Sequence, residues 1–316
     1  MILGIDTSCY TTSLAVVDRD GRVIEEARLL LKVKPGERGL QQSAAVFQHV
    51  QNIPLLIEGL SRHVDFNLIK GVCASTRPRP VKGSYMPVFT VSQGVGKIVA
   101  HSKGMPFFAT SHQEGHIMAG IWSAKGPDRK TFLAVHLSGG TSEVLRVEKK
   151  ETGFKIEILG ATGDLHAGQF IDRIGVEMGM PFPAGPHLER IAQERNEDIP
   201  YIPTGVKGYQ FSFSGPETAA RRLLSQGISR GLVARAVEHC IATTLEKVLR
   251  KAVQDHGLQD ILIVGGVASN KYIRQRLRKR LEHRAVGANL YFAEPRYSTD
   301  NAIGPALIGL AIHQKI

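Results

Sequence analysis

Two histidines, His112 and His116, stand four residues apart in the segment Ser111-His-Gln-Glu-Gly-His116. Ser111 follows a short apolar run and is a favourable N-cap, so the spacing predicts a helix with both imidazoles on one face. Two such imidazoles are typical ligands of one metal ion. The order differs from the His-Glu-x-x-His of zinc proteases, and Glu114 falls on another face, which disfavours a protease mechanism. The alternative is a structural or surface pair.

Three polar turns, each after an apolar run typical of a strand, have the chemistry to hold phosphates. A Gly-Gly turn lets backbone N–H groups approach an anion, and a helix that starts behind it adds the positive end of its dipole. None is a G-x-x-x-x-G-K-[ST] loop or a dinucleotide G-x-G-x-x-G fingerprint. The alternative is that they only connect strands to the next element. The turns are Asp6-Thr-Ser-Cys9, Leu137-Ser-Gly-Gly-Thr141 and Val264-Gly-Gly-Val-Ala-Ser-Asn270.

Two carboxylates occupy helical positions where they can serve either function or structure. Asp172 falls within a predicted helix at 167–179, and an acid there can accept hydrogen bonds from ribose hydroxyls. The alternative is an ion pair with a neighbouring Arg. Asp300 stands at the start of a predicted helix at 300–313, where a carboxylate suits an N-cap and the helix dipole. It becomes a site residue only if the fold brings it to the His pair.

Basic side chains outnumber acidic ones, since 40 Lys and Arg against 29 Asp and Glu give a net charge of +11. Such an excess attracts polyanions such as RNA, although it also serves solubility. A predicted helix at 270–283 packs one apolar face, and its other faces either contact RNA phosphates or are simply solvated. Its basic residues and those just after it are Lys271, Arg274, Arg276, Arg278, Lys279, Arg280 and Arg284.

The composition is that of an ordinary globular protein. Hydrophobic residues make up 42% and charged residues 22% of the 316 residues, which excludes disordered and collagen-like chains. Cys9, Cys73 and Cys240 are widely spaced, which excludes a disulfide framework and a thiolate zinc cluster. The chain shows neither a signal peptide nor an apolar run of the roughly 18 residues that a membrane span requires. We therefore expect a cytoplasmic protein with no membrane partner.

Both halves of the chain begin with the same pattern of β-rich runs joined by tight polar turns, which indicates an internal duplication. These runs are 2–6, 13–18 and 22–31, then 131–137, 143–148 and 155–159, with further strands predicted at 71–75, 106–109 and 261–264. Helices are predicted at 43–60, 92–103, 167–179, 214–225, 230–256, 270–283 and 300–313. Strands that alternate with helices indicate an α/β fold with helices over both sheets. A polar segment at 125–130 divides a lobe at 1–125, which carries the His pair, from a lobe at 126–316.

Six motifs resemble those of one family in their order and spacing. They are Gly4-Ile-Asp-Thr-Ser-Cys9, the His112/His116 segment, Ser138-Gly-Gly140, Phe211-Ser-Phe-Ser-Gly215, Gly265-Gly-Val-Ala-Ser-Asn270 and Thr299-Asp-Asn301. The family is the tRNA adenosine threonylcarbamoyltransferases, once called O-sialoglycoprotein endopeptidases. The resemblance covers nearly the whole chain. It implies a two-lobed α/β fold of the actin-like and sugar-kinase-like type, built from duplicated ribonuclease H-like units, with a nucleotide in the central cleft.

The resemblance also implies a reaction and a set of ligands. The family transfers a threonylcarbamoyl group from threonylcarbamoyl-AMP to the adenosine beside the tRNA anticodon, and the second lobe would hold this nucleotide or ATP. One iron or zinc ion would be bound by His112, His116 and Asp300. The substrate pocket would be lined by His136, Leu137, Ser138, Gly139, Gly140, Asp172, Gly185 and Asn270. Its implied partners are tRNA, a shorter paralogue of the same fold and a small ATPase.

Several positions near the expected chemistry depart from the family pattern. Tyr10 and Thr11 stand where the family has an acidic pair, Thr141 where it has a His, and Gln169 where it has a Glu. Arg77-Pro-Arg-Pro80 replaces a Gly-Pro-Gly-Leu loop. Each lost ionisable group removes a candidate for proton transfer, a contribution typically worth about 10²–10⁴-fold in rate. The pattern is typical of a diverged paralogue that keeps its binding residues better than its reactive ones.

Three hypotheses follow from these observations. The first is metal-assisted threonylcarbamoyl transfer to tRNA, in which the ion is a Lewis acid and a template. The second is a non-catalytic paralogue that binds nucleotide and metal and scaffolds or regulates the tRNA-modifying complex. The third is an ATP-dependent kinase of the same fold, against which stands the His pair, because sugar kinases have no place for it.

Overall fold

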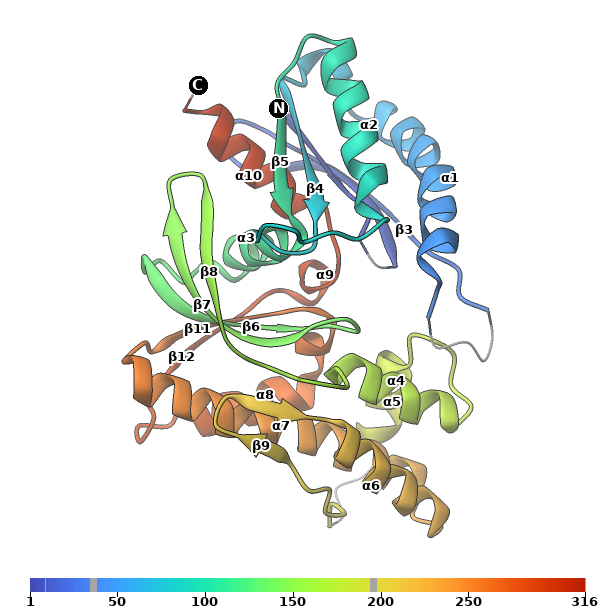
Figure 1. Cartoon of the computed structure of the whole chain (residues 1–316), viewed down its shortest axis with the longest axis vertical. Coiled ribbons are helices and arrows are strands. Elements are labelled where there is room, and N and C mark those ends of the chain that lie inside the picture. The colour runs from blue at the N-terminus through green and yellow to red at the C-terminus, as the bar shows by residue number, and fades with distance from the viewer. Residues whose placement is uncertain (9, 35–38, 194–197, 316) are drawn as a thin grey trace.

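Two five-stranded sheets, one above the other in Figure 1, form the framework of the molecule. The computed structural model describes residues 1–8, 10–34, 39–193 and 198–315, so Cys9 of the first predicted turn lies outside the described residues. The chain builds the first sheet, crosses to the second between Ala124 and Thr131, and returns to the first sheet with its last helix.

The first sheet has the strand order β3-β2-β1-β4-β5. β1, β2 and β3 form an antiparallel meander, and β4 and β5 continue the sheet in parallel with β1. β1 and β2 are buried over their whole lengths, as a near-continuous apolar run predicts. The strands are β1 (Ile2–Asp6), β2 (Thr11–Val17), β3 (Val23–Leu30), β4 (Gly71–Arg77) and β5 (Phe107–Ser111).

The second sheet repeats this arrangement, with the order β8-β7-β6-β11-β12 and the same parallel and antiparallel neighbours. The internal duplication predicted from the strand pattern is therefore confirmed. The predicted runs at 2–6 and 131–137 coincide with β1 and β6, whereas β12 was not predicted. The strands are β6 (Thr131–Leu137), β7 (Ser142–Lys150), β8 (Gly153–Ala161), β11 (Asp260–Val264) and β12 (Asn289–Phe292).

Helices lie outside each sheet and between the two. In Figure 1, α1 (Gln42–Ser61) and α2 (Phe89–Ser102) flank the first sheet, and α7 (Arg230–His256) and α8 (Lys271–Leu281) lie below the second. The layer between the sheets contains α3 (His112–Ala124), α9 (Pro295–Ser298) and α10 (Ile303–His313). The remaining elements are η1 (Phe66–Leu68), α4 (Ala167–Glu177), α5 (Gly185–Gln193), β9 (Gly205–Lys207), β10 (Gln210–Ser212), α6 (Ser214–Ser225) and η2 (Gly266–Ser269).

The seven helices predicted by periodicity are all present. Those at 214–225 and 230–256 coincide with α6 and α7, and the ends of the other five differ by at most three residues. α5, β9 and β10 were not predicted. None of the helices in the described ranges has the length and apolarity that a membrane span needs.

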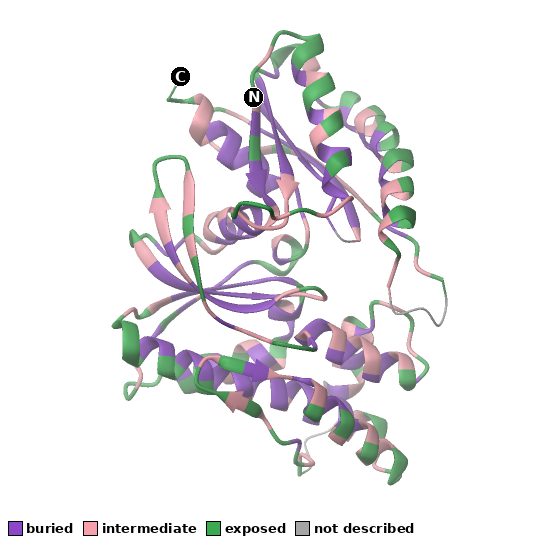
Figure 2. Ribbon diagram, viewed as in Figure 1, coloured by how far each residue is buried: buried purple, intermediate pink, exposed green. Residues whose placement is uncertain are grey.

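The two middle helices belong to different cores. α10 packs on the first sheet, where Ile303 and Ala306 join a cluster with Ile2 and Cys73. α3 packs on the second sheet through Ile117. Figure 2 shows this central region as largely buried, with exposed surface concentrated on the outer helices. The contact between α3 and α10 therefore links the two sheets at the level of the predicted site.

Candidate metal and nucleotide site

Three side chains from distant parts of the chain meet between the sheets: His112 and His116 of α3, and Asp300 before α10. The Nε2 atoms of the two imidazoles lie 3.1 Å apart. Asp300 Oδ1 lies 3.2 Å from Nε2 of His116 and 3.6 Å from Nε2 of His112. The condition that the sequence placed on Asp300, that the fold must bring it to the His pair, is met.

These separations fit one divalent metal ion. Ligand atoms about 2.1 Å from an ion lie about 3.0 Å apart in octahedral and about 3.4 Å apart in tetrahedral coordination. The three observed distances, 3.1, 3.2 and 3.6 Å, lie within about 0.2 Å of one or the other of these values. Two imidazole nitrogens and one carboxylate oxygen suit both iron and zinc. The donor set thus fits the ion that the family resemblance implies.

A close approach of two helices explains how the trio forms. Gly115 lies between the two histidines on α3, and Gly304 lies in the first turn of α10. A Cβ atom at Gly304 would lie 2.0 Å from the carbonyl oxygen of Gly115, so only glycine allows this contact. Because the backbones touch here, the segment that precedes α10 carries Asp300 to the His pair.

The N-termini of these two helices are capped by different residues from those that form the trio. α3 begins with a capping box in which Ser111 Oγ accepts from Glu114 N and the Glu114 carboxylate accepts from Ser111 N. The alternative role for Asp300, a cap of the last helix, is taken by its neighbour, because Asn301 Oδ1 accepts from the N–H groups of Ile303 and Gly304. The neighbouring amide performs the capping, so the Asp300 carboxylate faces the histidines.

A second carboxylate orients the first histidine. Asp6, at the end of β1, is fully buried, and its Oδ2 atom lies 3.4 Å from Nδ1 of His112. Ser8 Oγ donates to the same oxygen. A carboxylate behind a metal-binding imidazole fixes the tautomer and the ring orientation. The polar turn after β1, predicted as a phosphate loop, therefore also supports the His pair.

The pKa values of the histidines differ with their neighbours. Burial lowers the pKa of His112, but the charge and hydrogen bond of Asp6 and the charge of Asp300 outweigh it and raise the pKa overall. Burial, followed by the charge of His112, lowers the pKa of His116. Burial and the charge of His116 hold the pKa of His136 well below its usual range. His116 and His136 are therefore neutral at neutral pH, the form in which imidazole accepts a proton or binds a metal ion.

His136 lies beside this trio, at the end of β6. Its ring centroid is 4.4 Å from that of His116, and its side chain is buried. Neither ring nitrogen has a hydrogen-bond partner among the described residues. Leaving a buried nitrogen without a partner costs about 1–3 kcal/mol of folding free energy. β6 thus carries an unpaired imidazole directly before the Leu137-to-Gly140 turn.

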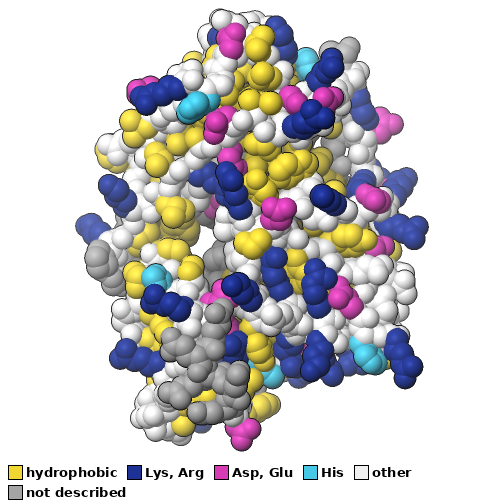
Figure 3. All heavy atoms as spheres, turned by 180° about the vertical axis from the view of Figure 1, so that it is seen from behind, with side chains coloured by type: hydrophobic (Ala, Val, Ile, Leu, Met, Phe, Trp, Pro, Cys, Tyr) yellow, Lys and Arg dark blue, Asp and Glu magenta, His cyan; other side chains and the backbone are white. Residues whose placement is uncertain are grey.

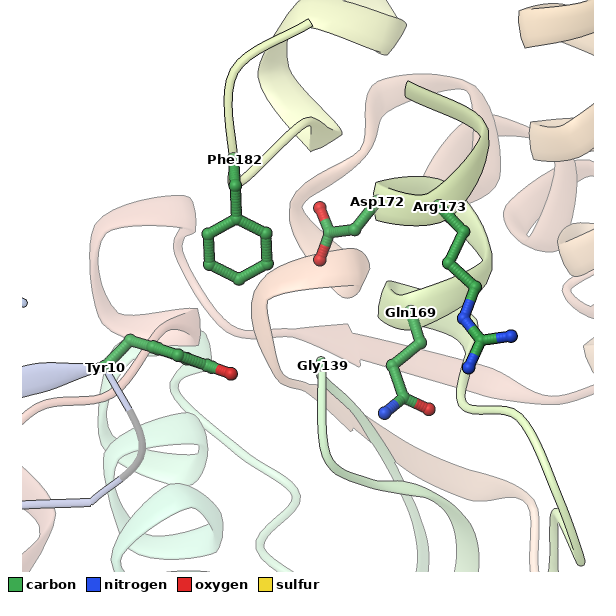
Figure 4. A pocket seen from close by; sticks show the side chains of 6 residues that line it. All are labelled: Tyr10, Gly139, Gln169, Asp172, Arg173 and Phe182. Atoms are coloured by element: carbon green, nitrogen blue, oxygen red, sulfur yellow. The ribbon is translucent and has the colours of Figure 1, made fainter. Parts of the chain in front are cut away.

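A small pocket of about 110 Å³ lies where the two lobes meet, next to this turn. Figure 4 shows Tyr10 from the first lobe on one side and the α4 side chains on the other. Burial raises the pKa of Asp172 to about 6, against the backbone hydrogen bond that its Oδ1 accepts from Ala184 N at 2.8 Å. The pocket is lined by Tyr10, Gly139, Gln169, Asp172, Arg173 and Phe182.

The two glycine turns differ: the Gly139-Gly140 turn has open space beside it, and the Gly265 turn packs tightly. A Cβ atom at Gly139 or Gly140 would meet no atom within 4 Å, so open space lies on one side of this turn. Gly140 N donates to Ser138 Oγ at 3.3 Å. Gly265 has a φ of 98° and lies against the backbone of Leu137, which binds the third predicted turn to the second. The two turns thus form one backbone cluster behind the pocket.

The remaining predicted residues are engaged in structure. Asn270 Oδ1 accepts from Ile273 N and caps α8, while its Nδ2 donates to the buried Glu238. Gly185 is the first residue of α5 and follows Ala184, the partner of Asp172. The alternative for Asp172 was an ion pair with a neighbouring Arg. The adjacent Arg173 instead pairs with Glu217, whose Oε1 lies 3.8 Å from Nη1 of Arg173.

The basic residues of α8 are mostly paired within the molecule. Arg276 and Arg280 both bind Glu246, and Arg278 binds Glu282. Arg274 donates to the carbonyl oxygens of Ala268 and Ala293. This helix therefore presents less free positive charge than its sequence indicates.

A bridge between the lobes was missed from the sequence. Arg79, in the loop after β4, donates to the carboxylate of Glu143 on β7, and Gln113 of α3 donates to its other oxygen at 2.8 Å. Gln113 N also donates to Pro78 O at 3.0 Å. Glu143 is buried and lies across from His136 in the sheet. The only signal in the sequence is that Arg79 belongs to the loop that departs from the family pattern.

Comparison with known proteins identifies the chain. A family model described as tRNA N6-adenosine threonylcarbamoyltransferase matches residues 31–307. A protein of that name from Thermus thermophilus is 33% identical over 323 residues, which cover 99% of this chain and 93% of the relative. The chain belongs to this family. The resemblance stated from the motifs is thereby confirmed.

Solved structures support the fold. Component A of the (R)-2-hydroxyglutaryl-CoA dehydratase of Acidaminococcus fermentans superposes with a TM-score of 0.60 at 15% identity, over 99% of this chain and 98% of that one. A ROK family glucokinase from Streptomyces griseus gives a TM-score of 0.52 at 15% identity, over 98% of each chain. The predicted two-lobed fold of the actin-like and sugar-kinase-like type is confirmed.

Family membership assigns the chain to an acyltransferase-type class of enzyme that transfers a threonylcarbamoyl group to tRNA adenosine. Neither the scaffold nor the kinase hypothesis gains support from these relatives or from the site. Family membership also indicates a metal ion and a nucleotide-related ligand.

Proposed function

We propose that this chain transfers the threonylcarbamoyl group of threonylcarbamoyl-AMP to N6 of the adenosine beside the tRNA anticodon. One iron or zinc ion would be held by Nε2 of His112, Nε2 of His116 and Oδ1 of Asp300. The observation that carries this proposal is the convergence of these donors, 3.1 to 3.6 Å apart, from segments 184 residues apart in sequence. When bound, the ion would supply a Lewis acid that polarises the oxygens of the donor substrate.

The nucleotide would occupy the interlobe pocket and the backbone cluster beside it. The open space beside Gly139 and Gly140 would take a phosphate, and the Asp172 carboxylate suits ribose hydroxyls. His136 lies between the trio and this turn, so its unpaired nitrogens would face the transferred group. The proposed lining is His136, Leu137, Ser138, Gly139, Gly140, Asp172, Gly185 and Asn270.

The reaction exchanges one bond to the carbamoyl carbon for another. The N6 amine forms a bond to that carbon, the bond from the carbon to the phosphate oxygen of AMP breaks, and N6 loses one proton. The chain's own residues would hold the two substrates at the same point and limit the access of water to His116, which is 3% exposed. Positioning of this kind contributes a large share of a catalytic effect without a protein nucleophile.

The departures from the family pattern leave this arrangement intact. Thr11 is buried in β2, and the carbonyl oxygen of Thr141 accepts from Ser138 N at 2.7 Å to close the turn. Gln169 Oε1 accepts from His166 N at 3.1 Å, where it closes the first turn of α4. These residues have structural roles, so we propose that transfer depends on positioning and the metal ion rather than on acids at these places.

The partner surfaces are part of the proposal. Figure 3 shows Lys and Arg side chains over both lobes of the face opposite Figure 1, which suits tRNA. α1 exposes Phe47, Val50 and Leu55, and α2 exposes Ile98, which would suit a shorter paralogue of the same fold. A small ATPase would complete the complex in the cytoplasm. We also propose the division into lobes at 1–125 and 126–316, the second of which returns α10 to the first sheet.

A reconstituted reaction tests this proposal. The protein, its partners, unmodified tRNA and threonylcarbamoyl-AMP are combined, and the tRNA nucleosides are analysed by mass spectrometry. We expect threonylcarbamoylated adenosine, its loss after treatment with a chelator, and its recovery with either Fe²⁺ or Zn²⁺, which would identify the ion. The absence of modified adenosine in the complete mixture would contradict the proposal.

A further inference from the structure

Arg79 lies where three elements of the two lobes meet. Its loop follows β4 in the first lobe, and its side chain donates to one oxygen of Glu143 on β7 in the second. A proline on each side of Arg79 restricts the backbone of the loop. Arg79 N donates to Ser84 Oγ at 3.0 Å, and Pro78 O accepts from Gln113 N of α3. The loop therefore holds the guanidinium in place beside α3.

The partner carboxylate places Arg79 next to the proposed reaction centre. Glu143 and His136 are paired directly in the antiparallel strands β7 and β6, so their side chains lie on the same face of the second sheet. The other oxygen of Glu143 accepts from Gln113 Nε2 at 2.8 Å, and Gln113 follows the proposed metal ligand His112. Through Glu143, Arg79 is thus a close neighbour of both His136 and the first turn of α3.

Glu143 engages only part of the guanidinium. An Arg side chain carries several N–H donors in a planar fork, and among the described residues this one donates a single hydrogen bond, to Glu143. The Arg79 side chain is 42% exposed, whereas that of Glu143 is 3% exposed. The charge also reaches His166 before α4, whose pKa is lowered first by burial and then by Arg79. The remaining donors are therefore available to an anion beside the Leu137-to-Gly140 turn.

The proposed donor substrate has two anionic groups on opposite sides of the carbamoyl carbon, the phosphate of AMP and the carboxylate of the threonyl group. The open space beside Gly139 and Gly140 would take the phosphate. A carboxylate matches the planar fork of a guanidinium, which can bind it in a bidentate manner. The threonyl carboxylate is thus the group for which Arg79 provides a partner.

We infer that Arg79 binds the threonyl carboxylate of the donor and selects donors that carry an acid at this position. The inference rests on the proposed transfer reaction and adds a specificity-determining residue to it. Glu143 orients the guanidinium from the buried side, as Asp6 orients His112. Arg79 belongs to the segment that departs from the family pattern, so this chain supplies the contact from a residue that the pattern lacks.

Calorimetric titration with three probes tests the inference: a non-hydrolysable analogue of threonylcarbamoyl-AMP, the same analogue with threoninamide in place of threonine, and AMP. The wild type should bind the acid about 10- to 100-fold more tightly than the amide, because hydrogen bonds between charged groups are among the strongest in proteins. Arg79→Gln should bind both analogues alike and keep the affinity for AMP. Arg79→Lys keeps the charge without the fork and should retain part of the preference.

Lys82→Gln is the matched control, because Lys82 is an exposed residue of the same loop and its substitution removes the same charge. Thermal unfolding monitors the fold of each variant. A preference for the acid that persists in Arg79→Gln, an equal loss for all three probes, or a wild type without a preference would overturn the inference and leave the proposed reaction standing. Wild-type protein that binds none of the probes would overturn the inference together with the nucleotide site on which it rests.

Discussion

The His112–His116–Asp300 trio and the Tyr10–Phe182 pocket are built in different ways. The trio lies between the sheets, with His116 buried and His112 and Asp300 partly exposed. Regular elements set its positions: the first turns of α3, the Gly115–Gly304 contact and the end of β1 behind His112. The pocket is lined by loop residues and by partly buried side chains of α4, and its two aromatic rings come from different lobes. One region is preformed, and the other depends on how the lobes approach each other.

The two regions would therefore perform different tasks in the proposed reaction: the trio would bind the metal ion and the pocket the nucleotide. A preformed trio can hold an ion in the same geometry through many turnovers, because its ligands are fixed by backbone packing and by a supporting carboxylate. A pocket between lobes would open to admit the proposed nucleotide and close again. Substitutions in the trio should therefore act on metal binding and activity, whereas those in the pocket should act on nucleotide affinity and stability.

The largest expected effect is the loss of a ligand from the preformed region. His116→Ala should reduce threonylcarbamoyl transfer to below about 1% of the wild-type rate. Even the loss of a residue that only orients a metal ligand typically lowers metal affinity or activity about 10- to 100-fold. The measurement is the initial rate of adenosine modification in the reconstituted reaction. His63→Ala, whose side chain is 67% exposed, should retain the full rate. Substantial activity in His116→Ala would show that the trio is not the reaction centre.

The next effect tests the support behind the trio. Asp6→Asn should weaken metal binding about 10- to 100-fold, because it removes the carboxylate that orients His112. Competition with a metal-binding dye measures the affinity, and thermal unfolding checks the fold of this buried position. Asp20→Asn, at an exposed position, is the control. Equal affinities in Asp6→Asn and wild type would mean that the His112 ring is positioned by packing alone.

A stability measurement sharpens the account of the pocket. Burial raises the pKa of Asp172 in the folded protein to about 6 from 3.8, so the folded state resists the ionisation that the unfolded chain undergoes. Stability is therefore lost as the pH rises from about 4 to about 6, and the loss is constant above that range. Asp172→Asn should increase the free energy of unfolding by about 1–2 kcal/mol at pH 7 and leave it unchanged at pH 4.

Denaturant unfolding at the two pH values checks this prediction, with Asp128→Asn at an exposed position as the control. The same substitution at Asp172 should weaken binding of AMP and of ribose 5-phosphate, because the carboxylate would bind ribose. A pocket residue that lowers stability and raises affinity is typical of a functional site. A destabilised Asp172→Asn protein at pH 7 would instead assign the carboxylate a structural role.

The smallest effect concerns the bridge between the two regions. Arg79→Ala should destabilise the protein by about 1 kcal/mol, because the partly exposed guanidinium no longer compensates the buried Glu143. Glu143→Gln should cost less, since Gln113 retains a partner. A double-mutant cycle should give a coupling free energy of about 0.5–3 kcal/mol. Additive effects of the two substitutions would show that the bridge does not connect the lobes energetically.

Much of the preformed region could be predicted from the sequence, because local signals specify it. Apolar runs predicted the strands that became β1 and β6, and the Ser111 cap with its i,i+4 histidines predicted the start of α3. Asp300 illustrates the limit of local reasoning. A carboxylate before a helix is a favourable cap, but the neighbouring Asn301 takes that role, and only the tertiary contact of α3 with α10 shows where Asp300 points.

The features between the lobes could not be predicted, because no local pattern encodes them. Tyr10 and Phe182 lie in different halves of the chain, and Arg79 meets Glu143 across the cleft. The ion pairs of the basic run of α8 could not be predicted for the same reason: the partner Glu246 lies on α7 and is invisible to a periodicity argument. Family departures at Tyr10 and Arg79 were the only signals that pointed to these places.

The central claim is that the trio binds a metal ion, and a metal analysis of wild type beside His112→Ala tests it most directly. Both proteins are stripped with a chelator, loaded separately with Fe²⁺ and Zn²⁺, freed of excess metal and analysed for bound ions. The account predicts one ion per chain in the wild type and almost none in His112→Ala, with unchanged thermal unfolding of the metal-free forms. Equal metal content in the two proteins would contradict it.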